Sequence, residues 1–330
     1  MKYAWQSKQW QQLWQARLSQ RLPHALLLSG IEGIGKSDFA LHLAQALLCS
    51  NAGNEGEPCC ECHACRLVMT DAHPNIKWLL PEKPGQAIKV DQVREINEFV
   101  QQSSFQGEFR FALVYPAHRM NMNAANALLK TLEEPADGAV IILITDRCGH
   151  MPATIRSRCH KISFPKPDHE QALAWLSQHK LSADISLEQR LRLFHGAPLL
   201  AVKAQDSDII SLRSELYQSL AGLATKKSTL LKLSAKWQKV DLHMWMDLFY
   251  NWISDLLKLQ LGVGGEFILN QDFSSELAAT ARLAPLQNNL RITSLLIKLR
   301  RQLNQGINFN KQLLIESMLI HWLETDHAAG

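Results

Sequence analysis

Residues 30–37 read GIEGIGKS, a pattern that is typical of a phosphate-binding loop. The loop contains three glycines, Gly30, Gly33 and Gly35. Glycine lets the backbone curve tightly, so that N–H groups can point at phosphate oxygens. Lys36 adds a positive charge near the β- and γ-phosphates, and the hydroxyl of Ser37 can ligate Mg²⁺. These residues therefore predict a site for ATP or ADP with Mg²⁺.

The segments on either side of this loop favour the same interpretation. HALLLSG (24–30) is a short apolar run that is typical of a buried strand, and residues 36–49 have helical spacing. The apolar residues of the second segment fall on one side: Phe39, Leu43, Ala46 and Leu47. A strand, a glycine-rich loop and a helix N-terminus together form an anion site, so a chance glycine turn is the weaker alternative.

Hydrolysis of a bound nucleotide needs a carboxylate at the end of a second apolar strand, where it holds Mg²⁺. The candidate strand, 109–115, is followed by Pro116, Ala117 and His118, none of which is an acid. Histidine is a poor substitute because Mg²⁺ prefers oxygen. Asp146 follows the apolar run 139–145, but an aspartate after a strand is also a common turn residue. We therefore predict a site that can hold nucleotide but hydrolyses it poorly.

Four of the seven cysteines have the spacing of a metal site: Cys49, Cys59, Cys62 and Cys65. Two overlapping C-x2-C steps make tight turns that direct thiolates to one point, as tetrahedral Zn²⁺ requires. The polar, glycine-rich segment 50–58 could not pack by itself, and a metal would hold it closed. Because four sulfurs leave no open coordination position, we predict structural Zn²⁺.

A disulfide or free thiols are the alternatives to zinc. The sequence shows no secretory signal and the phosphate loop implies ATP, so we expect the cytoplasm, where disulfides are rare. Cys60 could compete with Cys59 for the metal, and His63 is a weaker rival ligand. Cys148 and Cys159 stand alone and are not expected to be ligands.

Size and composition place the chain among globular proteins of two or three domains. It has 330 residues, of which 46% are hydrophobic, enough for substantial cores. Lys and Arg number 35 against 31 Asp and Glu, and the net charge of +4 is too weak to indicate nucleic-acid binding by itself. No apolar run approaches the ~20 residues that span a bilayer, so we expect no membrane partner.

Residues 1–165 alternate strand and helix patterns, which predicts a mostly parallel sheet flanked by helices. The expected segments after the cysteines are strand 75–82, helix 90–105, strand 109–115, helix 123–134, strand 139–145 and a turn into 156–164. Two prolines in FPKPDH (164–169) mark a boundary. The helical segments beyond it are 168–206, 241–262, 288–306 and 309–324. The thick apolar face of 241–262 indicates that the all-helical part from about 208 onward packs on neighbours, so we expect oligomerisation.

Several strings occur in an order that resembles one known family: RLPHALLLSGIEGIGKS, the cysteine loop, AANALLKTLEEP (124–135) and IRSRC (155–159). The chain resembles subunits of the bacterial replicative clamp loader, within the AAA+ class, and more narrowly the delta-prime subunits of DNA polymerase III. The similarity spans the chain in layout and is most specific over 21–165. It is only weakly diagnostic in the helical C-terminal part.

The resemblance implies a five-membered ring that opens the sliding clamp and places it on primer–template DNA. The implied partners are the gamma/tau and delta subunits and, through the assembled loader, the clamp and the DNA. Delta-prime subunits are stators that do not turn over ATP themselves. The chain would thus be a component of a DNA-directed DNA polymerase (a nucleotidyltransferase) without a polymerase site of its own. An active gamma-type ATPase of the loader is the alternative.

The resemblance also implies roles for individual residues. Arg158 of the SRC motif would stabilise the ATP of a neighbouring subunit as an arginine finger, and Arg156 is the nearby alternative. Thr145 matches the residue that senses γ-phosphate in active relatives, although threonine also suits a strand on propensity alone. Lys130 is a candidate coupling residue on its helix. Active relatives place a lid arginine on the phosphates, where this chain has Leu199.

The family layout implies three domains. Residues 1–165 would form the AAA+ P-loop domain with a zinc module at 49–65, residues 166–207 a helical lid, and residues 208–330 an all-α collar that builds the ring. Some delta-prime relatives have a degraded phosphate loop, whereas this one is intact. A zinc-containing nucleic-acid binder is a third interpretation, but the three glutamates within 49–65 make phosphate contact there unfavourable.

Overall fold

The computed structural model describes residues 3–83, 85–102, 109–181, 185–204, 209–224, 230–304, 307 and 309–323. The chain divides into two compact units. The α/β unit comprises Met1–Lys180 and Phe194–Val202, and the helical unit comprises Leu181–Leu193 and Lys203–Gly330.

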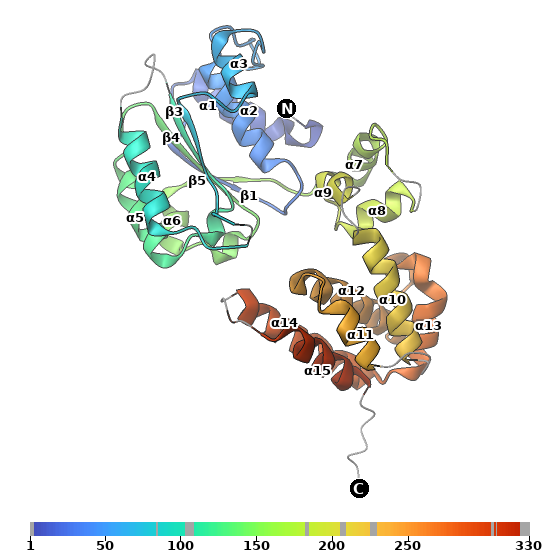
Figure 1. Cartoon of the computed structure of the whole chain (residues 1–330). Helices are drawn as coiled ribbons and strands as arrows, with labels where there is room; N and C mark the ends of the chain where they lie inside the picture. The colour runs from blue at the N-terminus through green and yellow to red at the C-terminus, as the bar shows by residue number, and fades with distance from the viewer. Residues whose placement is uncertain are drawn as a thin grey trace. The chain divides into compact units, whose positions relative to one another are not determined.

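A five-stranded parallel sheet organises the α/β unit (Figure 1). Its strands are β1 (Ala25–Ser29), β2 (Ile76–Leu79), β3 (Arg110–Val114), β4 (Ala139–Thr145) and β5 (His160–Ser163). The order across the sheet is β2-β3-β4-β1-β5. Strand β4 therefore separates β1 from β3, and the loops that follow these three strands leave the same edge of the sheet.

Helices cover both faces of this sheet (Figure 1). One face carries α1 (Ser7–Leu18) and α2 (Lys36–Leu48), and the other carries α4 (Val90–Gln101), α5 (Met122–Glu133) and α6 (Ala153–Arg158). Alternate residues of β1 serve the two cores, because Leu27 packs toward α4 and α5 while Leu26 and Leu28 pack toward α2. The predicted α/β class is confirmed.

The remaining elements of the α/β unit are short. They are η1 (Ala4–Gln6), α3 (His63–Met69), η2 (Ala117–Arg119), η3 (Cys148–His150), α7 (His169–Leu176) and α9 (Pro198–Lys203). Helix α6 was not expected, because the sequence predicted only a turn before 156–164. Pro152 precedes the helix, and proline at the start of a helix costs no backbone hydrogen bond.

The helical unit contains no strand in its described residues. Its helices are α8 (Leu187–Leu193), α10 (Ile209–Ala224), α11 (Leu230–Trp237), α12 (Leu242–Gln260), η5 (Gly265–Phe267), η6 (Gln271–Phe273), α13 (Ser274–Leu283), α14 (Leu286–Asn304) and α15 (Lys311–Leu323). Helix α12 is central, and the apolar face predicted for it is buried: Leu242, Trp245, Leu248, Phe249, Trp252, Ile253 and Leu256.

Parts of the predicted segments lie outside the described residues, namely 103–105, 182–184, 205–206, 305–306 and 324. So does the predicted boundary between 207 and 208. The three-domain division stays a prediction, since the segment 166–207 contributes residues to both compact units. None of the helices in the described ranges is long and apolar enough to cross a lipid bilayer.

Candidate functional site

The loop 30–37 connects β1 to α2, and its glycines are required by the local backbone. Gly33 and Gly35 have φ angles of +78° and +85°, which favour glycine. A Cβ on Gly33 would lie 2.4 Å from Leu200, and one on Gly35 would lie 2.2 Å from Tyr3. Gly30 is packed equally tightly, since a Cβ added there would lie 2.3 Å from the carbonyl oxygen of Phe164. The loop therefore has the tight backbone path that was predicted.

The N-terminal segment holds this loop from its carbonyl side. The indole Nε1 of Trp5 donates to the carbonyl of Ile34 at 3.0 Å. The amide of Gln6 donates to the carbonyls of Ile34 and Gly35 at 2.8 and 3.0 Å. The hydroxyl of Tyr3 donates to Asp38 in the first turn of α2 at 2.8 Å. No sequence motif indicated these contacts, because each depends on a bond between segments about thirty residues apart.

Lys36 is buried and is already engaged by the protein. Its ammonium donates to the carbonyl of Ile31 at 2.6 Å and to Asp146 Oδ1 at 2.7 Å. The two side chains of this ion pair are only 3% and 13% exposed. Ser37, the predicted Mg²⁺ ligand, occupies the first turn of α2 and is half-buried. The position of Asp146 after a strand is typical of a turn residue, but the structure brings its carboxylate to the phosphate loop.

The end of β3 carries no carboxylate, as the sequence indicated. His118 stands there, with its Nδ1 3.1 Å from the hydroxyl of Thr145. That hydroxyl accepts from the backbone N–H of Arg147 at 3.1 Å, so its single hydrogen is available to His118. Burial lowers the pKa of His118 to about 4, although the charge of Asp146 opposes this shift. The imidazole is therefore neutral at pH 7 and suited to accept from Thr145.

The turn at 195–201 lies against the phosphate loop. The backbone N–H of Leu199 donates to the carbonyl of Gly33 at 3.0 Å, and the side chain of Leu200 packs on Gly33. Leu199 is thus close to the loop, as expected, and the turn offers apolar side chains in place of an arginine. This contact is a further reason why Gly33 cannot carry a side chain.

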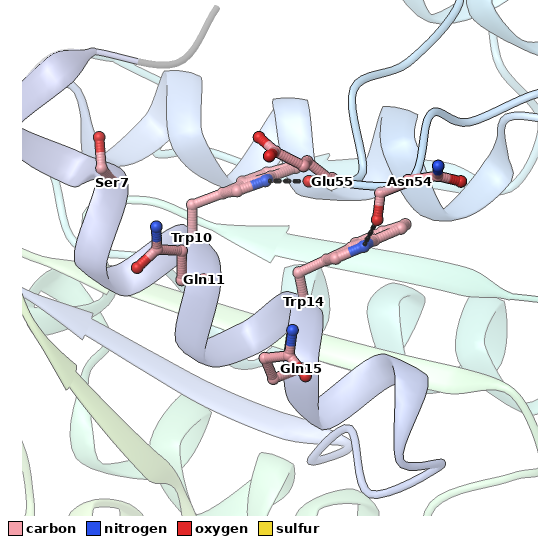
Figure 2. A pocket seen from close by; sticks show the side chains of 7 residues that line it. All are labelled: Ser7, Trp10, Gln11, Trp14, Gln15, Asn54 and Glu55. Carbon is pink, nitrogen blue, oxygen red and sulfur yellow. Dashed lines mark hydrogen bonds between the residues drawn. The ribbon is translucent and has the colours of Figure 1, made fainter.

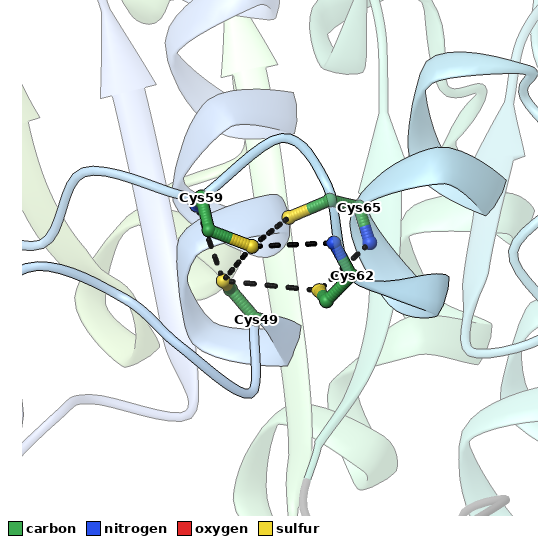
Figure 3. Close-up of side chains that lie close together, drawn as sticks. All are labelled: Cys49, Cys59, Cys62 and Cys65. Carbon is green, nitrogen blue, oxygen red and sulfur yellow. Dashed lines mark hydrogen bonds between the residues drawn. The ribbon is translucent and has the colours of Figure 1, made fainter.

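The four predicted zinc ligands lie together (Figure 3). The sulfurs of Cys49, Cys59, Cys62 and Cys65 are within 4.8 Å of one another. Cys49 Sγ lies 3.4 Å from Cys59 Sγ and 3.9 Å from Cys62 Sγ. Four sulfurs around tetrahedral zinc would be about 3.8 Å apart, given Zn–S bonds of about 2.3 Å. The cluster could therefore hold a metal ion, and its geometry is consistent with zinc.

Backbone N–H groups point at three of these sulfurs, which favours the thiolate form that binds metals. Cys59 N–H donates to Cys49 Sγ and Cys62 N–H to Cys59 Sγ, both at 3.3 Å. Burial raises the pKa of Cys62, but hydrogen bonds from Cys65 and Ser50 outweigh it and lower the pKa to about 6. Cys60 is exposed and bonds to the carbonyl of Pro58, outside the cluster.

Helix α1 anchors the loop that leads into this cluster (Figure 2). The indole N–H of Trp10 donates to the carbonyl of Glu55 at 2.8 Å, and that of Trp14 donates to the carbonyl of Asn54 at 3.0 Å. The two rings stack with centroids 6.1 Å apart. A cavity of about 440 Å³ lies between the helix and the loop, lined by Ser7, Trp10, Gln11, Trp14, Gln15, Asn54 and Glu55.

Arg158 occupies the last turn of α6 and is exposed, whereas Arg156 is half-buried. The Nε of Arg158 donates to Glu133 Oε1 at 2.5 Å, and the Nη1 of Arg158 donates to the carbonyl of Thr154 at 3.1 Å. Strand β5 starts just after Arg158 and pairs with β1 in parallel from Leu26 to Ser29. Arg158 therefore lies at the amino edge of the sheet, about 10 Å or more from the carboxyl edge that bears the phosphate loop.

The chain matches models of known protein families over most of its length. Residues 5–168 match the family described as DNA polymerase III, delta subunit. Residues 207–324 match the family described as DNA polymerase III, delta subunit, C terminal.

Two curated relatives that align over nearly the whole chain carry the same name. The chain is 33% identical to the DNA polymerase III subunit delta-prime of Pseudomonas aeruginosa over 97% of both chains. It is 32% identical to the subunit of the same name from Yersinia pestis, over 99% of this chain and 97% of that protein. Among solved structures, a gamma subunit-related protein of DNA polymerase III from Thermotoga maritima aligns over 95% of this chain and 100% of its own, with 20% identity and a TM-score of 0.48.

Proposed function

The chain belongs to the family of DNA polymerase III delta-prime subunits, and from this premise we propose that it acts in the clamp loader as a stator. It assembles with gamma/tau and delta subunits in the cytoplasm and, through the assembled loader, acts on the sliding clamp and primer–template DNA. Its own contribution to catalysis is a cation that it lends to a neighbouring subunit.

The position of Arg158 carries this proposal. Its guanidinium is exposed at the amino edge of the sheet, while the chain's own phosphate loop follows β1 at the carboxyl edge. From the amino edge of the sheet, the Arg158 guanidinium cannot reach a phosphate bound in the loop of its own chain. It could instead reach a nucleotide on an adjacent subunit. A planar, permanently charged guanidinium there would stabilise the negative charge that develops during phosphoryl transfer.

The environment of the chain's own loop supports poor hydrolysis. The end of β3 presents Tyr115, Pro116 and His118, which cannot replace the carboxylate that positions Mg²⁺ in active ATPases. The imidazole of His118 is neutral at pH 7, so it supplies no negative charge for Mg²⁺, and its Nδ1 is directed to Thr145. If ATP or ADP with Mg²⁺ binds through the loop 30–37 and Thr145, it serves as a structural ligand.

Zinc has a structural role in this account. Four thiolates from Cys49, Cys59, Cys62 and Cys65 would complete a tetrahedral shell and leave no position for a substrate. The metal would join the end of α2 to the start of α3 and hold the intervening loop against α1. We retain the division into an AAA+ domain at 1–165 with its zinc module at 49–65, a lid at 166–207 and a collar at 208–330 as part of the proposal.

Reconstitution tests this function. The purified chain is combined with gamma and delta subunits from the same organism, and loading of a fluorescent clamp onto primed DNA is measured. We expect ATP-dependent loading only when the chain is present. Equal loading without the chain would contradict the proposal, and ATP hydrolysis by the isolated chain at the rate of the gamma subunit would favour the gamma-type ATPase instead.

A further inference from the structure

The groups that would receive a nucleotide's phosphates are occupied by the protein itself. The Lys36 ammonium has three hydrogens, and two of them are directed to the carbonyl of Ile31 and to Asp146. The hydroxyl of Thr145 is shared between His118 and the N–H of Arg147. The side chains of Lys36 and Thr145 thus already have partners within the chain.

Asp146 is the charged member of this arrangement. It follows β4, which lies directly beside β1, so its carboxylate approaches the phosphate loop from the neighbouring strand rather than from β3. Both partners of the Lys36–Asp146 pair are shielded from water, and shielding strengthens the attraction between opposite charges. A phosphate that approached Lys36 would meet a carboxylate 2.7 Å from the ammonium, and like charges at this range repel.

We propose that Asp146 is an internal anion that occupies the Lys36 ammonium in place of a nucleotide phosphate and thereby lowers the affinity of this loop for ATP and ADP. The inference deepens the proposed function, because it rests on the loop 30–37 being a nucleotide site. It assigns Asp146 the opposite role to that of a Mg²⁺ ligand. A ligand to Mg²⁺ would strengthen nucleotide binding, whereas a competitor for Lys36 weakens it.

Calorimetric titration of the full-length chain with MgATP and MgADP tests the proposal. Asp146→Asn keeps the size of the side chain and removes its charge. We expect it to bind both nucleotides about tenfold more tightly or better, since a charge-assisted hydrogen bond no longer has to be displaced. Asp137→Asn is the matched control: it makes the same change at an exposed aspartate that precedes β4, outside the phosphate loop, while Lys36 keeps both of its bonds. The control should bind as the unaltered chain does.

Each outcome decides the proposal. Tighter binding by Asp146→Asn but not by Asp137→Asn supports it. Unchanged binding by Asp146→Asn overturns the proposal. Weaker binding overturns it too and indicates that Asp146 is a Mg²⁺ ligand. If none of the three proteins binds nucleotide detectably, the proposal also fails, because releasing Lys36 does not restore a site. Circular dichroism checks folding, and Asp146→Ser, which also removes the charge and keeps a small polar side chain, replaces the asparagine variant if that one does not fold. Clamp loading by the reconstituted loader, measured separately, tests the stator function without depending on this result.

Discussion

An ion pair between Arg158 and Glu133 joins α6 to α5, the two helices that carry the motifs IRSRC and AANALLKTLEEP. The Nε of Arg158, in the last turn of α6, lies 2.5 Å from Oε1 of Glu133, the last residue of α5. The guanidinium also bonds to the carbonyl of Thr154 one turn back in α6. These contacts hold one side of the guanidinium while its side chain remains 36% exposed. The arginine proposed to act in trans is therefore oriented by its own chain.

Glu133→Gln tests this orienting role. The pair is half-exposed, so its loss should cost less than about 1 kcal/mol of unfolding free energy. We nevertheless expect ATP turnover by the reconstituted loader to fall severalfold, because the arginine would sample more orientations before it meets the nucleotide. Glu134→Gln, an equal change at the next exposed residue, is the control. Identical turnover in the two variants would show that Glu133 does not position Arg158.

Removal of one thiolate tests the zinc site. Cys62→Ser should lose the metal, because a serine hydroxyl at neutral pH cannot replace the thiolate that the surrounding N–H groups stabilise. Zinc per chain, measured by mass spectrometry of the purified protein, should fall from about one to near zero. Cys60→Ser should retain it, since Cys60 lies outside the cluster. Full metal content in Cys62→Ser would rule out an essential role for that ligand.

The loop of this chain should not drive the loader's ATP turnover. Ser37→Ala removes the hydroxyl that would ligate Mg²⁺, and its small volume change should leave the fold intact. We expect turnover by the reconstituted loader to stay within about twofold of the unaltered complex, because the hydrolysing sites lie on other subunits. A loss as large as that caused by the corresponding serine substitution in the gamma subunit would instead indicate that this chain hydrolyses ATP.

The ion pair between the buried Arg213 and the partly exposed Asp272 should contribute to the stability of the helical unit. Arg213 is 2% exposed and donates to both oxygens of Asp272, at 2.7 and 2.5 Å, and to Asn270 at 2.9 Å. Arg213→Met would leave the buried amide oxygen of Asn270 without its donor, while the partly exposed Asp272 could still reach water, so we expect a cost of about 1–3 kcal/mol. The control, Lys236→Met, breaks an exposed pair with Glu215 and should cost less than about 1 kcal/mol. Urea unfolding measures both, and equal losses would contradict the importance of burial.

Features encoded by neighbouring residues could be predicted from the sequence. The glycine loop follows from local spacing, and the apolar face of α12 follows from its helical period. The four clustered thiols are close in sequence as well as in space, so their spacing was informative. The helix that bears Arg158 was missed, because six residues are too few for a periodic pattern to emerge.

Contacts between distant segments could not be predicted. Lys36 and Asp146 are 110 residues apart, and they meet only because the sheet places β4 beside β1. Glu133 and Arg158 meet because α5 and α6 end at the same edge of the sheet. The N-terminal residues Trp5 and Gln6 bear no motif, and their bonds to the phosphate loop appear only in the folded chain. The sheet topology, which a single sequence does not reveal, supplies the missing information in the first two cases, and the packing of the N-terminal segment on the phosphate loop supplies it in the third.

The central claim is tested most directly by ATP turnover of the loader reconstituted with Arg158→Ala, measured beside the isolated chain. The isolated chain should release no phosphate above background. Arg158→Ala should lower ATP turnover by about 10³-fold at the one nucleotide site that Arg158 completes. Turnover of the whole loader should therefore fall by the fraction that this site contributes to the total. Arg158→Lys, which keeps the charge without the planar fork, should recover only part of the loss. Unchanged turnover with Arg158→Ala, or rapid Mg²⁺-dependent phosphate release by the isolated chain, would contradict the account.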